Sequence, residues 1–555
     1  MNEISILIGG KAGFGIDKSS MVIGRLLAGI GYRIYIYRDY PSLIRGGHTF
    51  SIIRASKDRI YTHRDKVDLV IALNQETLDL HKKRLNKDCL FIFDSEQVKI
   101  ASNPACGIGL PLGKILKEEN APEIMRNTCI IGAMAKALGI NLDILENVLR
   151  KEFPRETELN LKVAQRGFNE SRQISKITPL AKPSLPLVSG NEAMGLGLIK
   201  GGLNTYIAYP MTPSSPILHF LAGAADNFSL DVIHPESEIS VILMALGYSY
   251  AGKKVAVGTS GGGFCLMTEA LSFAGMSELP VVIVLGQRPG PSTGLPTYSG
   301  QTELHFALSA GQGEFLRFIV APGDAEEAYY WSAVAMNISW KYQVPSIILS
   351  DKNMGEGISN FDITLVPDIK EESPLLWGNR PPYKRYLFTE NGVSPLASPG
   401  QKDAIIKVNS YEHDESGITT EDPELTKLMQ EKRLRKEKFI IKEMEKLETV
   451  KTSGKKNSSK AILCWGSNKG PCVEVAQKLG LKVIQPVLLN PFPVNKFKKA
   501  LSGVKKLICV ENSSTGQLPR LVKNYGFGVD KTILKYDGRP FSLEELEAKV
   551  KGAIK

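Results

Sequence analysis

The sequence predicts an α/β protein built from several doubly wound, mostly parallel sheets. Apolar stretches of strand length alternate with helical segments along most of the chain, the order that produces parallel sheets. The 51 glycines and 31 prolines are typical of many strand-to-helix turns. At 555 residues the chain is too long for one hydrophobic core, so several domains are expected.

The first expected domain covers residues 1–176 and opens with a strand, a helix and a second strand. The expected strands are 4–8, 33–37, 67–73 and 89–94, and the expected helices are 21–32, 127–139 and 142–153. A proline-containing linker, 177–190, should separate this domain from the next.

The second expected domain covers residues 191–355 and repeats strand and helix, which predicts a parallel sheet with helices on both faces. Its expected strands are 204–209, 231–234, 254–259, 280–286, 316–321 and 345–350. An irregular, aromatic-rich connection and a charged helix follow over 356–455, and a third α/β unit over 456–555. The mixed charges of 431–460 favour a solvent-exposed helix.

Composition excludes several classes of function. No apolar run approaches the length that crosses a bilayer, and the N-terminus lacks a basic signal region, so we expect a cytoplasmic protein without a membrane partner. The seven cysteines form no C-x-x-C pair, so we expect no metal site in this chain. The net charge of +11 favours acidic partners, but no recognition helix or zinc finger points to nucleic acid.

Candidate site residues follow successive strands of the second domain. The carboxyl ends of parallel strands share one edge of a sheet, where ligands usually bind. The candidates are Thr212, Glu236, Glu238, the glycine loop 260–264, Arg288 and Thr297.

Each of these side chains has a structural and a functional interpretation. Thr212 before Pro213 predicts a helix N-cap, and its hydroxyl could also donate to a bound anion. Arg288 is either a surface arginine or a planar partner for a carboxylate. Glu238 starts an apolar helix, where it either complements the dipole or faces a protonatable ring nitrogen, whereas for Glu236 we favour capping.

The N-terminal segment GGKAGFG is more ambiguous. Its glycines at 9, 10, 13 and 15 match neither the dinucleotide-binding nor the P-loop order, so a tight strand-to-helix turn competes with a phosphate cradle. Arg45, beside Gly46 and Gly47, could present charge to a phosphorylated ligand or a partner domain.

Several long motifs resemble the α subunit of 2-oxoacid:ferredoxin oxidoreductases. They are AYPMTPSSP, PESEISVILMALGYSYAG, TSGGGFCLMTEALSFAGMSELPVVIVLGQRPGPSTGLPT, VENSSTGQLPRLV and KYDGRPF. GGKAGFGI and YPSLIRGGHTF resemble the γ domain of that family, fused in front. The resemblance covers almost the whole chain. It implies a γ-type domain over 1–176, a pyrimidine-type thiamine diphosphate-binding domain over 191–355 and a transketolase C-terminal-like domain over 456–555.

The resemblance also implies residue roles. Glu238 is similar to the catalytic carboxylate that hydrogen-bonds the aminopyrimidine ring of thiamine diphosphate, and Pro210, Gly261 and Gly262 would contact the same cofactor. The 2-oxoacid would be held by Thr212, Arg288 and Thr297, with Arg288 as the main carboxylate partner. One departure is Gln312, where relatives often have histidine, so the resemblance implies no substrate role for this position.

The implied activity is coenzyme A-dependent oxidative decarboxylation of a 2-oxoacid to acyl-CoA and CO₂, with electrons passed to ferredoxin and the direction left open. We expect 2-oxoglutarate as substrate, with pyruvate and branched-chain acids as alternatives. The resemblance implies a β subunit that supplies Mg²⁺ and a [4Fe-4S] cluster. This chain agrees with that expectation, since it has no G-D-G diphosphate motif and no cluster of cysteines. We expect a dimer of αβ heterodimers. A non-catalytic assembly subunit and a nucleotide-binding protein using GGKAGFG are the competing hypotheses.

Overall fold

In the computed structural model, which describes residues 2–42, 46–100 and 107–555, the chain forms two compact units. The first contains Met1–Val188, Gly357–Asp362 and Ser542–Ala548. The second contains Ser189–Glu356, Ile363–Phe541 and Lys549–Lys555. Each of the three sheets described below lies within one unit, except that Ser189, the last residue of the edge strand β7 (Leu187–Ser189), belongs to the second unit.

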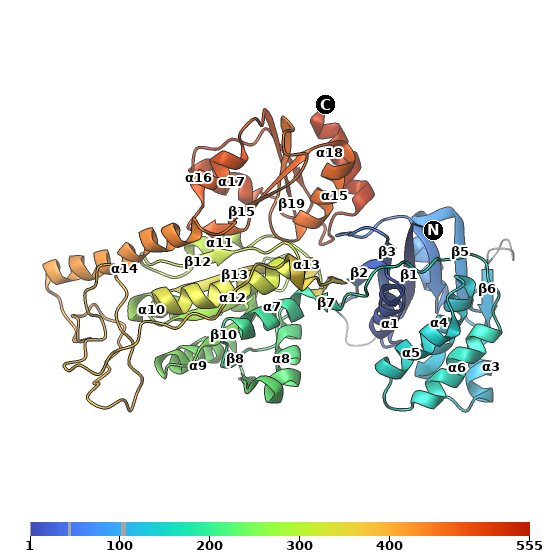
Figure 1. Cartoon of the computed structure of the whole chain (residues 1–555), viewed down its shortest axis with the longest axis horizontal. Helices are drawn as coiled ribbons and strands as arrows, with labels where there is room; N and C mark the ends of the chain where they lie inside the picture. Colours follow the sequence, from blue (N-terminus) through green and yellow to red (C-terminus); the bar gives the residue numbers. More distant parts are fainter. Residues whose placement is uncertain (1, 43–45, 101–106) are drawn as a thin grey trace. The chain divides into compact units, whose positions relative to one another are not determined.

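The first unit is built on a sheet with the strand order β6-β5-β4-β1-β3-β2-β14-β7. These strands are β1 (Glu3–Lys11), β2 (Arg33–Asp39), β3 (His48–Ser56), β4 (Val67–Ala72), β5 (Leu85–Asp94), β6 (Gly107–Leu110), β7 (Leu187–Ser189) and β14 (Ile358–Asn360). Helices α1, α4, α5 and α6 pack together on one side of the sheet (Figure 1). The helices of this unit are α1 (Ile16–Gly29), α2 (Gln75–His81), α3 (Leu112–Glu118), α4 (Arg126–Ala137), α5 (Leu142–Glu152) and α6 (Thr157–Asn169).

This first sheet is mixed, because β3 lies between β1 and β2 and runs antiparallel to both. The opening strand, helix and strand were expected from the sequence, but β3 was not. β1 and β2 are therefore parallel with one strand between them, and α1 makes the crossover. Alternate residues of β1 face opposite sides of the sheet. Ile6 and Ile8 belong to the hydrophobic core that includes α1, α4, α5 and α6, whereas Leu7 belongs to a smaller hydrophobic core.

The second unit contains a sheet with the order β18-β12-β13-β11-β10-β8-β9. These strands are β8 (Thr205–Ile207), β9 (Asp231–Ile233), β10 (Val255–Ser260), β11 (Val281–Gln287), β12 (Phe318–Val320), β13 (Pro345–Asp351) and β18 (Leu488–Asn490). All neighbours from β12 to β9 are parallel, and only the edge strand β18 is antiparallel. The doubly wound, mostly parallel fold class is thus confirmed.

Helices pack in two groups around this sheet. On one face, α9 contacts α10; on the other, α7 contacts both α8 and α12. Their bounds are α7 (Gly190–Lys200), α8 (Ser215–Phe228), α9 (Glu238–Tyr250), α10 (Gly261–Ser277), α11 (Leu304–Ser309), α12 (Ala325–Tyr342) and α13 (Lys352–Glu356). The loops that follow β8, β9, β10 and β11 therefore meet at the carboxyl edge of the sheet.

A further sheet of the second unit has the order β15-β17-β16-β19-β20. Its strands are β15 (Val450–Gly454), β16 (Lys460–Leu463), β17 (Lys482–Pro486), β19 (Lys506–Glu511) and β20 (Lys531–Leu534). The helices in this part of the second unit are α15 (Lys469–Leu479), α16 (Val494–Ala500) and α17 (Gln517–Asn524). Helix α18 (Leu543–Ile554) is divided, because its residues up to Ala548 belong to the first unit and the rest to the second. Three of the four pairings in this sheet are parallel, and only the edge strand β15 pairs antiparallel, with β17.

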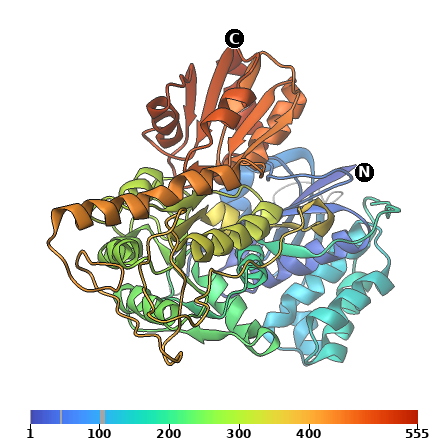
Figure 2. The same ribbon diagram turned by 60° about the vertical axis from the view of Figure 1, so that its left-hand side comes forward.

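The charged helix is α14 (Pro423–Met444), the long orange helix that crosses the second unit in Figure 2. The expectation of a solvent-exposed helix is wrong for one of its faces, because Lys432 and Lys436 are fully buried. Both ammonium groups pair with the buried carboxylate of Glu278, at 2.7 Å and 2.5 Å. These cations and Arg385 hold the pKa of Glu278 well below its usual range despite the desolvation. An internal ion-pair cluster therefore anchors α14.

Candidate functional site

Thr212 lies in the turn between β8 and α8, but it does not cap the helix. The helix begins at Ser215, its N-cap is Ser214, and the proline in its first turn is Pro216. The predicted cap at Thr212 with Pro213 as first helical residue is therefore wrong. Thr212 is half-buried, and its carbonyl oxygen accepts a hydrogen bond from Nη1 of Arg288 at 3.0 Å.

Arg288 follows β11 and points its guanidinium into the protein. Only 7% of the residue is exposed, which excludes the surface-arginine interpretation. Its Nε is buried and has no hydrogen-bond partner among the described residues. Burial lowers the pKa of Arg288, while the nearby carboxyl groups of Glu303 and Glu238 raise it. The structure thus holds a desolvated cation with one donor unused.

Glu238 is the first residue of α9 and is 6% exposed. The N-cap is the neighbouring Ser237, which accepts from the Ser240 amide, so Glu238 is not needed as a cap. A Cβ placed on Gly263 would lie 2.5 Å from Oε1 of Glu238 and 2.2 Å from Oγ1 of Thr259. Glycine at 263 therefore leaves room for this carboxylate. Glu236 is exposed and accepts a hydrogen bond from the Ser240 hydroxyl, without being the cap.

The structure adds Glu303 to this site, a residue that the sequence did not single out. It immediately precedes α11, its residue is 8% exposed, and Oε2 has no partner among the described residues. A Cβ on Gly261 would lie 2.7 Å from its Oε1, so the carboxyl group packs against the start of α10. Burial raises the pKa of Glu303 to about 7, against the lowering effects of Thr302 and Arg288.

The other predicted site residues differ in burial. Thr297 is 7% exposed, and its hydroxyl is buried without a partner in the described part of the chain. Pro210 and Gly262 are exposed, and a Cβ on Gly262 would meet only ordinary contact with the Ser292 carbonyl at 3.9 Å. Gln312 is also exposed, and its backbone N–H donates a hydrogen bond to the Ser272 hydroxyl. No steric constraint therefore requires glycine at 262.

An apolar surface begins beside Glu238. We call it the α9/α10 face and define it by Ile239, Leu243 and Met244 of α9 and Leu266 of α10, which are 40–51% exposed. The three α9 residues share one side of the helix by their spacing. Cys265, next to Leu266, is an exposed cysteine. Clustered large apolar side chains in contact with solvent are typical of a surface that another protein covers.

The N-terminal glycine segment forms a tight turn between β1 and α1. Gly13 and Gly15 have positive φ angles of 90° and 71°, which glycine adopts without strain. This geometry fits the turn interpretation. Arg45, the other charged candidate of this domain, lies outside the described residues.

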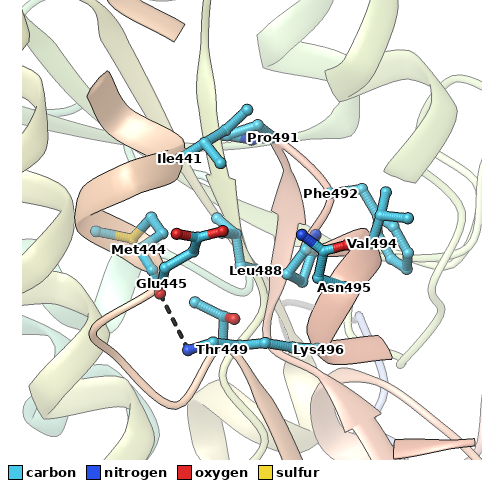
Figure 3. Close-up of a pocket in the computed structure, with 11 residues that line it drawn as sticks. Ile441, Met444, Glu445, Thr449, Leu488, Pro491, Phe492, Val494, Asn495 and Lys496 are labelled. Atoms are coloured by element: carbon cyan, nitrogen blue, oxygen red, sulfur yellow. Dashed lines mark hydrogen bonds between the residues drawn. The ribbon is translucent and has the colours of Figure 1, made fainter. Parts of the chain in front are cut away.

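The remaining features that would indicate a function are a cavity, a metal site and a membrane-spanning helix. A cavity of about 220 Å³ lies between the end of α14 and the β18 region, lined by Ile441, Met444, Leu488 and Phe492 among others, and none of the predicted site residues lines it (Figure 3). Within the described ranges, no group of three or more His, Cys, Asp or Glu side chains is arranged to hold a metal ion. No helix in these ranges is long and apolar enough to span a membrane.

Two protein-family models match the chain. Residues 196–431 match "Pyruvate flavodoxin/ferredoxin oxidoreductase, thiamine diP-bdg", which describes a thiamine diphosphate-binding domain. Residues 5–170 match "Pyruvate ferredoxin/flavodoxin oxidoreductase". The first range contains Thr212, Glu238, Arg288 and Thr297.

Individual proteins match over the whole chain. The 2-oxoacid:ferredoxin oxidoreductase subunit alpha of Saccharolobus solfataricus is 30% identical over 625 residues, covering 100% of this chain and 98% of the relative. The 2-oxoglutarate oxidoreductase subunit KorA of Mycobacterium tuberculosis is 27% identical, covering 100% and 92%. The solved 2-oxoglutarate:ferredoxin oxidoreductase of Magnetococcus marinus, with 2-oxoglutarate, coenzyme A and succinyl-CoA bound, is similar with a TM-score of 0.90 and 28% identity over 100% of both chains.

Proposed function

Because this chain belongs to the family of 2-oxoacid:ferredoxin oxidoreductase α subunits, we propose that it provides half of a thiamine diphosphate-dependent active site. The reaction is the coenzyme A-dependent oxidative decarboxylation of a 2-oxoacid, with ferredoxin as electron acceptor. The observation that carries the proposal is the meeting of Glu238, Arg288 and the Thr212 turn at the carboxyl edge of one parallel sheet. Polar atoms left without partners at this edge favour a ligand site over a structural cluster.

The buried acid and its glycine neighbours fit thiamine diphosphate. Glu238 would accept a hydrogen bond from the cofactor's aminopyrimidine ring, and Gly263 leaves the space for that carboxylate. Pro210, Gly261 and Gly262 would complete the contacts made by this chain. When bound, thiamine diphosphate supplies the nucleophilic carbon and the electron sink for decarboxylation. The role of Glu238 is to hold a proton at the ring nitrogen that it faces.

Arg288 would receive the carboxylate of the 2-oxoacid. Its Nε–H is a charged donor without a partner within the described residues, and the Thr297 hydroxyl is a second unused donor. The hydrogen bond from Nη1 to the Thr212 carbonyl fixes one edge of the guanidinium, so that its remaining donors are oriented. Thr212 would thus assist the substrate through its backbone as well as its hydroxyl.

We assign 2-oxoglutarate as the favoured substrate. The Mycobacterium tuberculosis relative is named for 2-oxoglutarate, and the Magnetococcus marinus enzyme was solved with 2-oxoglutarate and coenzyme A bound. The matching family models are named for pyruvate, so pyruvate and branched-chain 2-oxoacids are the alternatives.

The second half of the active site would come from a β subunit covering the α9/α10 face. The relatives are named as subunits, and this face starts one residue after Glu238. We assign Mg²⁺, a [4Fe-4S] cluster and the docking of ferredoxin to that subunit, since the seven cysteines of this chain are not spaced for a cluster. Two αβ heterodimers would associate, and the complex would work in the cytoplasm.

Co-expression with the β partner tests this function. We expect coenzyme A-dependent reduction of a viologen dye with 2-oxoglutarate and less with pyruvate or 2-oxoisovalerate. A complex that binds thiamine diphosphate and contains reducible clusters, yet reduces no dye with any of the three acids, would favour a non-catalytic assembly subunit. A preference for pyruvate would overturn the substrate assignment alone.

A further inference from the structure

We propose that Glu303 is a positioning residue for Arg288 and that it couples binding of the 2-oxoacid carboxylate to uptake of one proton from solvent. The inference rests on the proposed function, because it requires that Arg288 receives the substrate carboxylate. It assigns a role to an acid that belongs to none of the motifs used above.

The position of Glu303 is unusual for a carboxylate. The residue is 8% exposed, and no lysine or arginine side chain in the described part of the chain donates a hydrogen bond to it. Oε1 contacts Oγ1 of Thr302 at 2.7 Å, a hydrogen bond from the Thr302 backbone also lowers the pKa of the carboxyl group, and Oε2 has no partner within the described residues. A buried ionised carboxylate normally has several donors or a paired cation, so these contacts favour the protonated acid.

The Thr302 hydroxyl gives an independent geometric argument. Its oxygen lies 3.2 Å from the carbonyl oxygen of Arg288 and 2.7 Å from Oε1 of Glu303. A hydroxyl has one proton and cannot donate to both acceptors. If Glu303 is protonated, its own O–H donates to Thr302, and Thr302 donates to the Arg288 carbonyl. Protonated Glu303 therefore completes a chain of hydrogen bonds that ends on the backbone of Arg288.

The charges around Glu303 also favour its protonated form once the substrate binds. The guanidinium of Arg288 interacts electrostatically with both Glu303 and Glu238, so one buried cation already balances two carboxyl groups. Asp351, at the end of β13, adds a further acid that raises the pKa of Glu303, whereas Arg288 lowers it. On the helix that follows, the His305 ring contacts the Gln517 carbonyl instead. A substrate carboxylate would add a third negative group around Arg288, and protonation of Glu303 removes the excess charge.

A specific pH dependence follows. Burial places the pKa of Glu303 at about 7 in the substrate-free protein, and a bound carboxylate raises it further. Above pH 7, binding then requires proton uptake, so the KM for the 2-oxoacid rises toward about tenfold per pH unit. The value of kcat reports the substrate complex, in which Glu303 is already protonated, so kcat stays flat over the same range.

The test uses the complex with the β subunit and measures kcat and KM for 2-oxoglutarate and pyruvate between pH 6 and 9. We expect the wild type to show a rising KM with a flat kcat. Glu303→Gln, which mimics the protonated acid in shape, should show a KM that no longer rises with pH. Glu303→Asp keeps a titratable carboxyl and should retain the slope with a displaced midpoint. Glu390→Gln removes an exposed carboxylate elsewhere in the same unit and should retain the wild-type slope.

The outcomes separate the two proposals. Turnover by the wild type with a KM that is independent of pH overturns the role of Glu303 and leaves the proposed function intact, even if Glu303→Gln fails to fold. If KM rises with pH by the same slope in wild type and in Glu303→Gln, the role of Glu303 is also overturned. This includes the case in which Glu303→Gln raises KM by the same factor at every pH, which a structural role would produce. Absence of turnover with every 2-oxoacid overturns the proposed function itself.

Discussion

Replacing Arg288 by alanine should weaken 2-oxoacid binding far more than it slows the reaction. The residue is 7% exposed, and one of its guanidinium nitrogens is held by the Thr212 carbonyl at 3.0 Å. A charged hydrogen bond in such a sheltered position contributes about 1.5–3 kcal/mol. Loss of the bond to the substrate carboxylate alone should therefore raise the KM by about 10- to 150-fold. The carboxylate loses its charge as it leaves as CO₂, so Arg288 would stabilise the bound acid more than the transition state, and kcat should change less than the KM.

The assay is dye reduction by the αβ complex over a range of 2-oxoacid concentrations. Arg288→Lys keeps the charge but loses the planar donor pair, so its KM should lie between those of wild type and Arg288→Ala. Arg520→Ala removes an exposed arginine of α17 and serves as the matched control. A thermal melt distinguishes loss of binding from loss of fold, because Arg288→Ala also breaks the bond to Thr212. An unchanged KM in folded Arg288→Ala would refute the carboxylate-binding role.

Three further predictions concern the cofactor, the partner and the fold. Glu238→Gln should lower dye reduction by at least about 100-fold, because the acid is lost, while dithionite still reduces the clusters. The control variant Glu236→Gln, at an exposed neighbouring residue, should retain activity. Near wild-type turnover in Glu238→Gln would refute the cofactor role of Glu238 and leave only its interaction with the helix dipole. Cys265 should react with N-ethylmaleimide in the isolated chain and be protected from it in the αβ complex. Peptide mass spectrometry measures the labelling. Equal labelling of the isolated chain and the complex would exclude the α9/α10 face as the β-subunit interface. Glu278→Gln should lower the free energy of unfolding by about 3–5 kcal/mol in urea titrations, because two buried ammonium groups lose their counter-ion. Since the folded-state pKa of Glu278 is depressed, the contribution of Glu278 to the free energy of unfolding should be complete above its ordinary pKa of 4.5 and be lost as the pH falls below that value. If Glu278→Gln changes the free energy of unfolding by less than about 0.5 kcal/mol, the size typical of surface substitutions, the result would argue against the buried ion pairs.

Strands buried on both faces were the most predictable elements. β10, β11 and β13 match the expected ranges to within a residue or two, because a parallel strand covered by helices on both faces is an almost continuous apolar run. β3 was missed because its buried residues include polar and charged side chains such as Ser51 and Arg54. Arg54 is satisfied by the Thr62 carbonyl and the Glu3 carboxylate, partners that come from other parts of the chain.

The start of α8 shows why a correct local signal can be placed on the wrong residue. A hydroxyl residue precedes proline twice in this segment, at Thr212–Pro213 and at Ser215–Pro216. Both pairs fit a helix start, and the helix begins at the second pair, with Ser215 as its first residue and Ser214 as its N-cap. Packing decided between them, because Pro213 lies in the turn against Gly286, and Arg288 binds the carbonyl of Thr212.

The sequence by itself determined the alternating elements of the fold and the chemical types at the strand ends: a hydroxyl, a carboxylate, a glycine loop and a guanidinium. These follow from local periodicity and from the rule that successive parallel strands end at one edge. Only the tertiary structure decided which charges are buried together. Lys432 is 154 residues from Glu278, and Glu303 reaches Gly261 and Arg288 through folding alone. The physical reason is that the ionisation and energy of a buried charge depend on its neighbours in space, which the local sequence does not encode.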